Sequence, residues 1–295
     1  MPLNKDKKSI IGEAAMAVTN ALAEDIGSGD ITSEILIPAD AVLKADIVVK
    51  EDDIVVCGTD VVAEVFRQVD ASIKVRVRVK DGQKVKKDTV ICTVNGPARG
   101  ILTAERTALN FLARLCAIAT KTSRMVDKIR PYKAKILDTR KTTPGMRFLE
   151  KYAVKTGGGV NHRFGLFDQV LIKDNHLGLL RSAKPDYSID TALSEARKRL
   201  KDTKIKIEVE VENLDDFKKV LAVRPDVVML DNMSPAMMKK AVAVRDACNK
   251  KIKLEASGNI TEENIAQFAR CGVDYISSGS LTHSVKAIDV SLVVQ

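Results

Sequence analysis

The spacing of hydrophobic residues in the first hundred positions predicts a helix followed by a sheet. In residues 9–24 apolar side chains recur every three or four positions, which is typical of an amphipathic helix. Residues 24–38 contain two glycines and end on Pro38, which predicts a loop. From residue 41 to about residue 102 apolar residues alternate or run together, as in VLKADIVVK and TVICTVNG. This pattern predicts a small antiparallel sheet that the first helix covers on one face.

A helical spacing returns at residues 100–130, where Leu109 and Leu112 fall on one apolar stripe. Thr103 is the predicted N-cap of this helix, because its hydroxyl can accept a hydrogen bond from a free backbone N–H. Arg106 then falls in the first turn, where a positive charge opposes the helix dipole. We interpret Arg106 either as an exposed, solvated arginine or as a residue with another task.

Six short apolar runs that end in polar residues follow Pro131. The last four alternate with helical stretches, and a strand–helix–strand order of this kind implies parallel strands with right-handed crossovers. A complete barrel needs about eight strands. The pattern therefore predicts an α/β fold with an open or incomplete barrel. The six runs are AKILDTRK, DQVLIKDN, KIEVEVEN, DVVMLDN, IKLEASGN and VDYISSGS.

Composition narrows the class of protein. Of the 295 residues, 45% are hydrophobic and 29% are charged, as in an ordinary globular protein. No apolar run reaches the roughly 18 residues that cross a bilayer. The first ten residues, MPLNKDKKSI, have no apolar stretch after their lysines and so do not predict a secretory signal. We interpret the chain as a cytoplasmic protein without a membrane segment.

Cysteines and charge argue against two further classes of site. The five cysteines are scattered, so they predict buried free thiols rather than a disulfide framework or a zinc site. The net charge of +9 could indicate nucleic acid or small anionic substrates. Aromatic residues make up only 4% of the chain and the lysines are scattered, which argues against nucleic-acid binding.

The polar residues that end the six runs are expected to lie together, because the carboxyl ends of parallel strands meet at one edge of a sheet. His162 and Arg163 enter this edge from the loop before the second strand. The residues at the six strand ends are Asp138, Thr139, Arg140 and Lys141; Lys173, Asp174 and Asn175; Glu208, Glu210 and Glu212; Asp231 and Asn232; Ser257 and Gly258; and Ser278, Gly279 and Ser280.

These residue types predict an enzyme that acts on a phosphorylated anion. Clustered arginine and lysine hold carboxylates or phosphates through charge-assisted hydrogen bonds. Glu210 and Asp231 suit a magnesium ion that bridges to substrate phosphates. The small-residue turns EASGN and SSGS can bind a phosphate through backbone N–H groups. Taken singly, these features have ordinary alternatives. A glutamate in an alternating strand can face solvent, and a Ser-Gly pair can be a simple turn. His162 and His176 could also be zinc ligands, but no cysteine or third histidine lies near them in the sequence.

One long segment, DTRKTTPGMRFLEKYAVKTGGGVNHRFGLFDQVLIKDNH, resembles the signature of the quinolinate phosphoribosyltransferase family. VEVEN, MLDNMSP and LEASGNI resemble further blocks of this family in the same order, so the resemblance covers nearly the whole chain. It implies an N-terminal α/β sandwich with an antiparallel sheet over residues 1–115 and an open α/β barrel over residues 116–280. Residues 281–295 are expected to return to the sandwich.

The resemblance also implies a reaction. A phosphoribosyl group passes from phosphoribosyl pyrophosphate to the ring nitrogen of quinolinate, which loses its 2-carboxylate. The products are nicotinate mononucleotide, pyrophosphate and carbon dioxide, in NAD biosynthesis. The implied cofactor is Mg²⁺, and the implied assembly is a homodimer or a higher homo-oligomer.

Site residues follow from the resemblance position by position. The implied catalytic residues are Lys141, Lys173, Glu210 and Asp231, of which Glu210 and Asp231 lie near the ribose and magnesium. Asn259, Ser278 and Ser280 depart from the family's usual residues and put the phosphate contacts in doubt. The substrate-binding residues are the basic pocket for the quinolinate carboxylates, Arg140, Lys141, His162, Arg163 and Lys173, with Thr139; Arg106 from the partner subunit; the pair Glu210 and Asp231; and the phosphate turns, Ser257, Gly258, Asn259, Ser278, Gly279 and Ser280.

Other interpretations stay open at this point. One is a family member with a different acceptor, such as nicotinate. Another is a carrier module, because VKDGQKVKKDTVICTVNG faintly resembles biotinyl and lipoyl domains, although it lacks their modified lysine. The glycines of KTGGGVNHR lack the spacing of a phosphate-binding loop, so we interpret them as a turn that lets His162 and Arg163 approach the substrate.

Overall fold

The computed structural model describes residues 7–201 and 203–295. Contacts divide the chain into two units, which we describe separately. The antiparallel unit holds the residues up to Ser123 together with 142–158 and 281–295, and the parallel unit holds 124–141 and 159–280. Boundaries were predicted after residues 115 and 280, with residues 281–295 returning to the sandwich; the contacts place 281–295 in the antiparallel unit and add residues 142–158 to it. The first ten residues were predicted not to form a secretory signal, and residues 1–6 of this segment lie outside the described residues.

The antiparallel unit contains the sheet that the alternating pattern predicts. Its strands pair in the order β12–β1–β5–β3, and all of these pairs are antiparallel. The C-terminal strand therefore lies at the edge of this sheet, with Leu292 opposite Ile47. A separate two-stranded sheet joins β2 and β4. The strands are β1 (Val42–Val49), β2 (Ile54–Val55), β3 (Lys74–Val77), β4 (Lys84–Val85), β5 (Val90–Pro97) and β12 (Val290–Val294).

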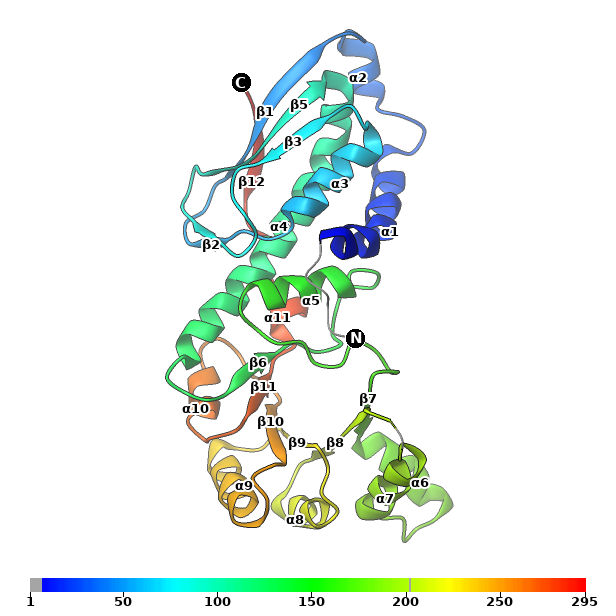
Figure 1. The fold of residues 1–295 in the computed structure, drawn as a ribbon, viewed down its shortest axis with the longest axis vertical. Coiled ribbons are helices and arrows are strands. Elements are labelled where there is room, and N and C mark those ends of the chain that lie inside the picture. The colour runs from blue at the N-terminus through cyan, green and yellow to red at the C-terminus, as the bar shows by residue number, and fades with distance from the viewer. Residues whose placement is uncertain (1–6, 202) are drawn as a thin grey trace. The chain divides into compact units, whose positions relative to one another are not determined.

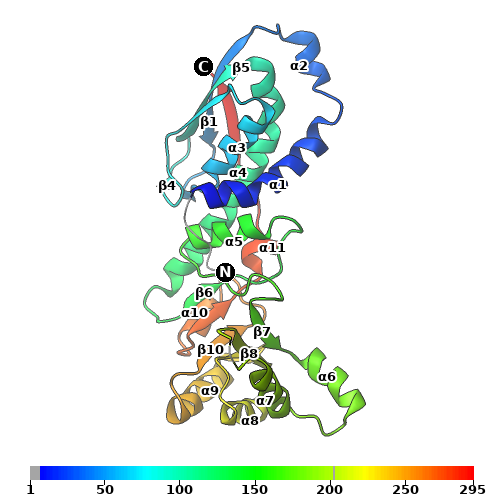
Figure 2. The same ribbon diagram turned by 45° about the vertical axis from the view of Figure 1, so that its right-hand side comes forward.

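Helices of the antiparallel unit include one that the sequence analysis missed. The first helix, α1 (Lys7–Ile26), confirms the amphipathic prediction and buries Ala14 and Val18. It packs on the missed helix α3 (Thr59–Val69), which in turn contacts β3. Figures 1 and 2 both show α3 and α4 alongside the strands. The first helix was predicted to cover the sheet, but it packs on α3, and α3 forms the layer nearer to β3.

Two local predictions in the antiparallel unit are wrong. The expected loop contains the short helix α2 (Ile31–Leu36), which begins where the Asp30 carboxylate accepts a hydrogen bond of 3.0 Å from the N–H of Ser33. The long helix α4 (Ala98–Ile129) begins five positions before Thr103, so Thr103 is not its N-cap. The Thr103 hydroxyl instead donates to Asp30 over 3.0 Å.

The parallel unit contains the six predicted strands in one sheet. Their order is β6–β11–β10–β9–β8–β7, and every pair is parallel. Among the described residues no pairing joins β6 to β7, so the sheet is open, as predicted. The strands are β6 (Lys135–Leu137), β7 (Gln169–Ile172), β8 (Lys206–Val211), β9 (Val227–Asp231), β10 (Lys253–Ser257) and β11 (Tyr275–Ser277).

Helices connect and cover these strands. Both α7 and α8 pack on β8, and Figure 2 shows α6 extending to one side of the strands. Most residues of β8 are consequently buried, and these include Glu208 as well as its apolar residues. No helix in the described parts of the chain is long and apolar enough to span a membrane. The helices are α6 (Asp174–Ala183), α7 (Ile189–Arg199), α8 (Leu214–Ala222), α9 (Pro235–Cys248) and α10 (Ile265–Ala269).

Candidate active site

Parallel register brings the predicted strand-end residues to one edge of the sheet. Asp231 at the end of β9 pairs with Ser257 at the end of β10, and Leu137 at the end of β6 pairs with Ser277 of β11. Lys173 directly follows β7. Because parallel strands share a direction, these ends form a single rim. Arg106 lies in the antiparallel unit on α4, where its side chain is exposed.

The loop that carries His162 and Arg163 is fixed by Asp138. This carboxylate is fully buried and accepts hydrogen bonds from the backbone N–H of His162, over 2.9 Å, and from the Asn161 side chain, over 2.5 Å. Just before these residues, Val160 bridges to Leu137 of β6. A buried carboxylate requires such donors, so Asp138 holds the loop rather than facing the substrate.

Two arginines of the rim lie close enough to affect one another. Burial lowers the pKa of Arg163 and the positive charge of Arg140 lowers it further. The Arg163 side chain donates to the backbone oxygen of Gln169 over 3.2 Å. Within the described residues the buried Nε of Arg140 has no hydrogen-bond acceptor. A buried N–H donor next to a second guanidinium suits a bound anion, which would accept that hydrogen bond and offset the repulsion.

Acidic and basic groups meet on the other side of the rim. Lys173 forms an ion pair with Glu210, with 3.1 Å between Nζ and Oε2. Burial raises the pKa of Glu210; Lys173 opposes this rise, while Asp231 and Asp174 add to it. A carboxylate that is crowded by further carboxylates is stabilised by a cation. The oxygen donors of Glu210 and Asp231 therefore fit Mg²⁺ with water and phosphate as the remaining ligands.

The turn after β10 has a backbone conformation that few residues adopt. Gly258 has a φ of 100° and Asn259 a φ of 49°. A Cβ atom on Gly258 would collide with the side-chain oxygen of Asn232 and lie 2.8 Å from its backbone nitrogen. Asn259 stands where the family usually has glycine, and asparagine is a residue that tolerates the left-handed conformation. The departure at Asn259 thus leaves the shape of the turn intact.

Ser278 has a structural part in the second small-residue turn. Its backbone N–H donates to Leu137 over 3.1 Å, and its hydroxyl donates to the backbone oxygen of Ile260 over 2.6 Å. Its hydroxyl also lies 2.9 Å from that of Ser280. Both donors of Ser278 are therefore already directed to the protein, and its side chain shapes the turn next to the rim.

The three glycines that precede the His162 loop follow a helix end. Helix α5 (Arg147–Thr156) ends at Gly157, where a Cβ atom would collide with the backbone oxygen of Ala119 and lie 2.7 Å from the Cβ of Thr122. The first glycine is thus required by close packing against α4. This agrees with the interpretation of the stretch as a turn rather than as a phosphate-binding loop.

The sequence analysis missed Glu255 as a member of the site. Glu255 of β10 and Glu208 of β8 are both buried, and each has a carboxylate oxygen close to the imidazole of His162. The only signal in the sequence is a glutamate within the strand KLEAS, and one charged residue in a short strand does not reveal what it contacts.

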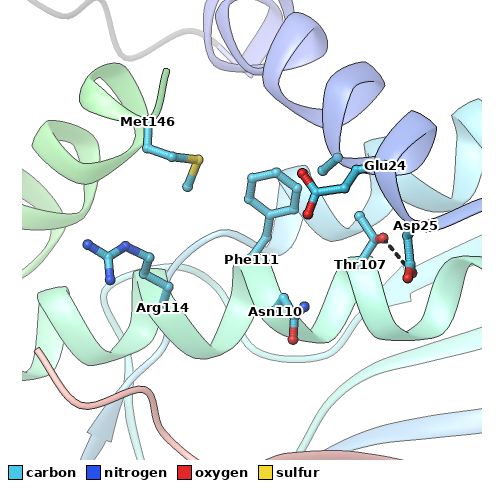
Figure 3. A pocket seen from close by; sticks show the side chains of 8 residues that line it. Glu24, Asp25, Thr107, Asn110, Phe111, Arg114 and Met146 are labelled. Atoms are coloured by element: carbon cyan, nitrogen blue, oxygen red, sulfur yellow. Dashed lines mark hydrogen bonds between the residues drawn. The ribbon is translucent and has the colours of Figure 1, made fainter. Parts of the chain in front are cut away.

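A pocket of about 230 Å³ in the antiparallel unit is separate from the predicted site. Figure 3 shows Glu24 and Asp25 of α1 opposite α4, with Asp25 accepting a hydrogen bond of 3.2 Å from Thr107. In the part of the chain that the structure describes, none of the predicted site residues lines this pocket. Its lining residues are Ala21, Glu24, Asp25, Thr107, Asn110, Phe111, Arg114 and Met146.

The fold defines a class, namely α/β proteins with an open barrel of parallel strands, and the predicted strand-end residues lie at the carboxyl ends of these strands. Family models for quinolinate phosphoribosyl transferase match residues 30–116 with the N-terminal domain and residues 118–293 with the C-terminal domain. The chain therefore belongs to the quinolinate phosphoribosyltransferase family.

Individual relatives are similar over almost the entire chain. A probable carboxylating nicotinate-nucleotide pyrophosphorylase of Bacillus subtilis is 42% identical, over 91% of this chain and 89% of the relative. The carboxylating nicotinate-nucleotide pyrophosphorylase of Mycobacterium leprae is also 42% identical, over 93% and 95%. The solved structure of the nicotinate-nucleotide pyrophosphorylase from Francisella tularensis has a TM-score of 0.88 and 43% identity, and covers 99% of both chains.

Proposed function

We propose that this chain transfers the phosphoribosyl group of phosphoribosyl pyrophosphate to quinolinate and releases carbon dioxide, forming nicotinate mononucleotide for NAD biosynthesis. Membership of the family supports this proposal, as do relatives named for this activity. The observation that carries it is the buried Nε of Arg140, which has no acceptor among the described residues and lies near the charge of Arg163.

The basic residues of the rim would bind the two carboxylates of quinolinate. Arg140 and Arg163 are the partly buried pair, and Lys141 is exposed beside them. Lys173 is held by Glu210 at the neighbouring strand end. Quinolinate and phosphoribosyl pyrophosphate both carry negative charge, so fixed cations are needed before the reacting atoms can approach. Thr139 accepts a hydrogen bond from the N–H of Lys141 over 3.0 Å and so orders this segment.

Glu210 and Asp231 are proposed to face the ribose and to hold Mg²⁺. When bound, the metal would neutralise charge on the pyrophosphate leaving group. The two carboxylates would stabilise the positive charge that develops at C1 of the ribose, without attacking it. The phosphate of the substrate would lie against the turns at Ser257–Asn259 and Ser278–Ser280, where backbone N–H groups other than that of Ser278 would be the donors.

The chemistry needs no separate catalytic base. The bond from C1 to the pyrophosphate oxygen breaks as the quinolinate nitrogen forms its bond to C1, and pyrophosphate leaves with the electron pair. The ring then carries a positive charge next to the 2-carboxylate. Loss of carbon dioxide leaves its electron pair on the ring carbon, which takes a proton from water. Lys141 and Lys173 would hold the acceptor in place during both steps.

A homodimer or higher homo-oligomer is part of the proposal. The exposed Arg106 on α4 would enter the basic pocket of a partner subunit. We also propose that the enzyme works in the cytoplasm. All five cysteines are free, and four of them are buried, which fits a reducing compartment.

The test is product formation with two acceptors. The purified protein is incubated with phosphoribosyl pyrophosphate and either quinolinate or nicotinate, with and without Mg²⁺. We expect nicotinate mononucleotide from quinolinate, dependent on Mg²⁺, and no product from nicotinate. Product from nicotinate without carbon dioxide would instead identify a family member with a different acceptor.

A further inference from the structure

The ring of His162 points towards a buried pair of carboxyl groups. Its Nε2 lies 3.1 Å from Oε2 of Glu208 and 3.7 Å from Oε2 of Glu255. The histidine side chain is 7% exposed and the two glutamate side chains are 1% and 2% exposed. His162 was predicted as part of a basic pocket, but this geometry directs its Nε2 into the sheet rather than outwards.

Hydrogen bonds assign the position of the proton on this ring. The backbone N–H of Arg163 donates to Nδ1 of His162 over 2.7 Å, so Nδ1 keeps its lone pair. A neutral imidazole has one donor and one acceptor, and the hydrogen must therefore be on Nε2, where it is donated to Glu208. In this arrangement the ring is neutral. Its two hydrogen bonds connect the backbone of Arg163 to Glu208 of β8.

The same three side chains resemble a metal site, because their ligand atoms lie within 4.8 Å of one another. A metal ion binds to a lone pair of the imidazole, and Nε2 has no free lone pair when it carries the hydrogen. In addition, the Gln169 side chain donates to Oε2 of Glu208 over 2.7 Å, which occupies the oxygen nearest the ring. These contacts favour a hydrogen-bonded cluster over a metal centre.

The two glutamates form one unit within the cluster. Burial raises the pKa of Glu255 well above its ordinary value, and the negative charge of Glu208 raises it further. Burial thus favours the neutral form of Glu255. Oε2 of Glu208 accepts from Gln169 and lies 3.1 Å from Nε2 of His162. Within the described residues, the Oε1 atom of each glutamate has no hydrogen-bond partner, so the interactions of the pair converge on the Oε2 side.

We propose that Glu208 and Glu255 are positioning residues, which hold His162 as the neutral Nε2–H tautomer and thereby fix the backbone of Arg163 at the edge of the anion pocket. Gln169 strengthens the link, since its side chain binds Glu208 and its backbone oxygen accepts from the Arg163 guanidinium. The carboxyl pair thus sets the direction of a positive charge without touching the substrate. The kinetic part of this inference rests on the proposed function.

The tautomer can be measured in the unmodified protein. The chain has three histidines, so ¹⁵N-histidine labelling gives few signals, and the His162→Asn variant identifies those of His162. We expect imidazole ¹⁵N shifts of a neutral ring with hydrogen on Nε2 at pH 7.5. A ring with hydrogen on Nδ1, or a doubly protonated ring, would overturn the inference. So would stoichiometric Zn²⁺ binding that shifts the His162 signals, because it would identify a metal site.

Two variants test the positioning role. Glu255→Gln keeps a neutral hydrogen-bonding group, so we expect the wild-type tautomer and a KM for quinolinate within about twofold. Glu208→Ala removes the acceptor, so we expect loss of the tautomer signature and a KM for quinolinate about tenfold higher, as for one lost hydrogen bond to a charged group. The KM for phosphoribosyl pyrophosphate should change by less than about twofold, because the cluster supports the acceptor pocket.

Asp215→Asn is the control for loss of one negative charge, because this side chain is 88% exposed on α8. It should leave both KM values and the His162 signals unchanged. A folded Glu208→Ala protein with unchanged His162 signals and an unchanged KM for quinolinate would overturn the positioning role. If the wild-type protein lacks turnover, the proposed function fails, whereas the tautomer measurement still decides the structural part.

Discussion

At the scale of single residues, Arg140 and Arg163 are distinguished from the other basic side chains of the rim by their partial burial and by their effect on one another. The chain carries 48 lysines and arginines, most of which can be solvated at the surface. Arg140 and Arg163 differ from these solvated side chains in two ways. Protein surrounds part of each guanidinium group, and each lies near the charge of the other. Glu208 and Asp168 offset part of the charge of Arg163. The buried Nε of Arg140, by contrast, has no acceptor among the described residues, which supports the proposal that an anion binds beside it.

Replacement of Arg140 by alanine tests this assignment. We expect kcat/KM for quinolinate to fall by at least about 100-fold, because charge-assisted hydrogen bonds of about 1.5–3 kcal/mol each are lost. Thermal unfolding should be little changed. Arg130→Ala is the matched control, since the Arg130 side chain is 79% exposed, and it should keep wild-type kinetics. A folded Arg140→Ala protein with wild-type activity would show that the site has been misplaced.

The sequence could predict rim residues only where local pattern determines their position. Asp231 ends a buried strand, so its place at the edge of the sheet follows from the pattern. Glu255 could not be identified, because its importance depends on His162, which is 93 positions away by the numbering of the sequence. Likewise Thr103 was wrongly predicted as an N-cap, because Ala98 and its neighbours extend the helix without an obvious start signal.

At the scale of elements, strands were predicted more reliably than short helices. The six parallel strands are short, mostly apolar runs that end in polar residues, and such runs are distinctive. Helix α3 was missed because its 11 residues lie between alternating segments and its valines suit a strand as well as a helix. Only the contacts of α3 with α1 and β3 decide between the two.

The turn after β10 gives an element-scale prediction. Gly258→Ala should lower the free energy of unfolding by about 1–3 kcal/mol, because alanine at a φ of 100° is strained and its Cβ would meet Asn232. Gly178→Ala in α6 is the matched control, as a Cβ there meets nothing within 4 Å. It should be stabilising by up to about 1 kcal/mol. Urea unfolding of both variants checks the pair, and equal stabilities would contradict the argument.

A buried ion pair joins α9 to the segment before β11. Arg245 is 2% exposed, and its Nη1 lies 2.7 Å from Oδ2 of Asp274. Burial alone would raise the pKa of Asp274, but hydrogen bonds from Arg245 and from the N–H of Leu254 hold it below its ordinary value. A carboxyl group whose pKa is lower in the folded than in the unfolded protein stabilises the fold at pH values above its unfolded pKa. This stabilisation is lost as the pH falls through the folded pKa.

Asp274→Asn should therefore destabilise the protein by about 2 kcal/mol at pH 7, because the buried Arg245 loses one of its two carboxylate partners among the described residues and keeps only Asp246. The difference from wild type should shrink as pH falls below about 4, where this carboxyl group takes up a proton in the unfolded chain, and should disappear below the lowered pKa of the folded protein. Urea unfolding at several pH values measures both effects. A difference that stays constant down to pH 3 would show that the charge of Asp274 is not responsible.

At the scale of the whole molecule, the proposal requires two chains for one complete site. If Arg106 acts in the partner's pocket, Arg106→Ala and Arg140→Ala place both defects in the same site of a mixed dimer and leave the other site intact. Co-refolding equal amounts of the two inactive variants should then restore about a quarter of wild-type activity, because about half of the dimers are mixed and each mixed dimer has one intact site. Recovery of no activity would indicate that Arg106 does not act across an interface.

The central claim is that the anion-binding rim performs both glycosyl transfer and decarboxylation. Its most direct test follows quinolinate labelled with ¹³C in the 2-carboxylate, mixed with phosphoribosyl pyrophosphate, Mg²⁺ and the purified protein. We predict that labelled carbon dioxide and unlabelled nicotinate mononucleotide form in equal amounts. Nicotinate mononucleotide without labelled carbon dioxide, or no nucleotide at all, would contradict the account.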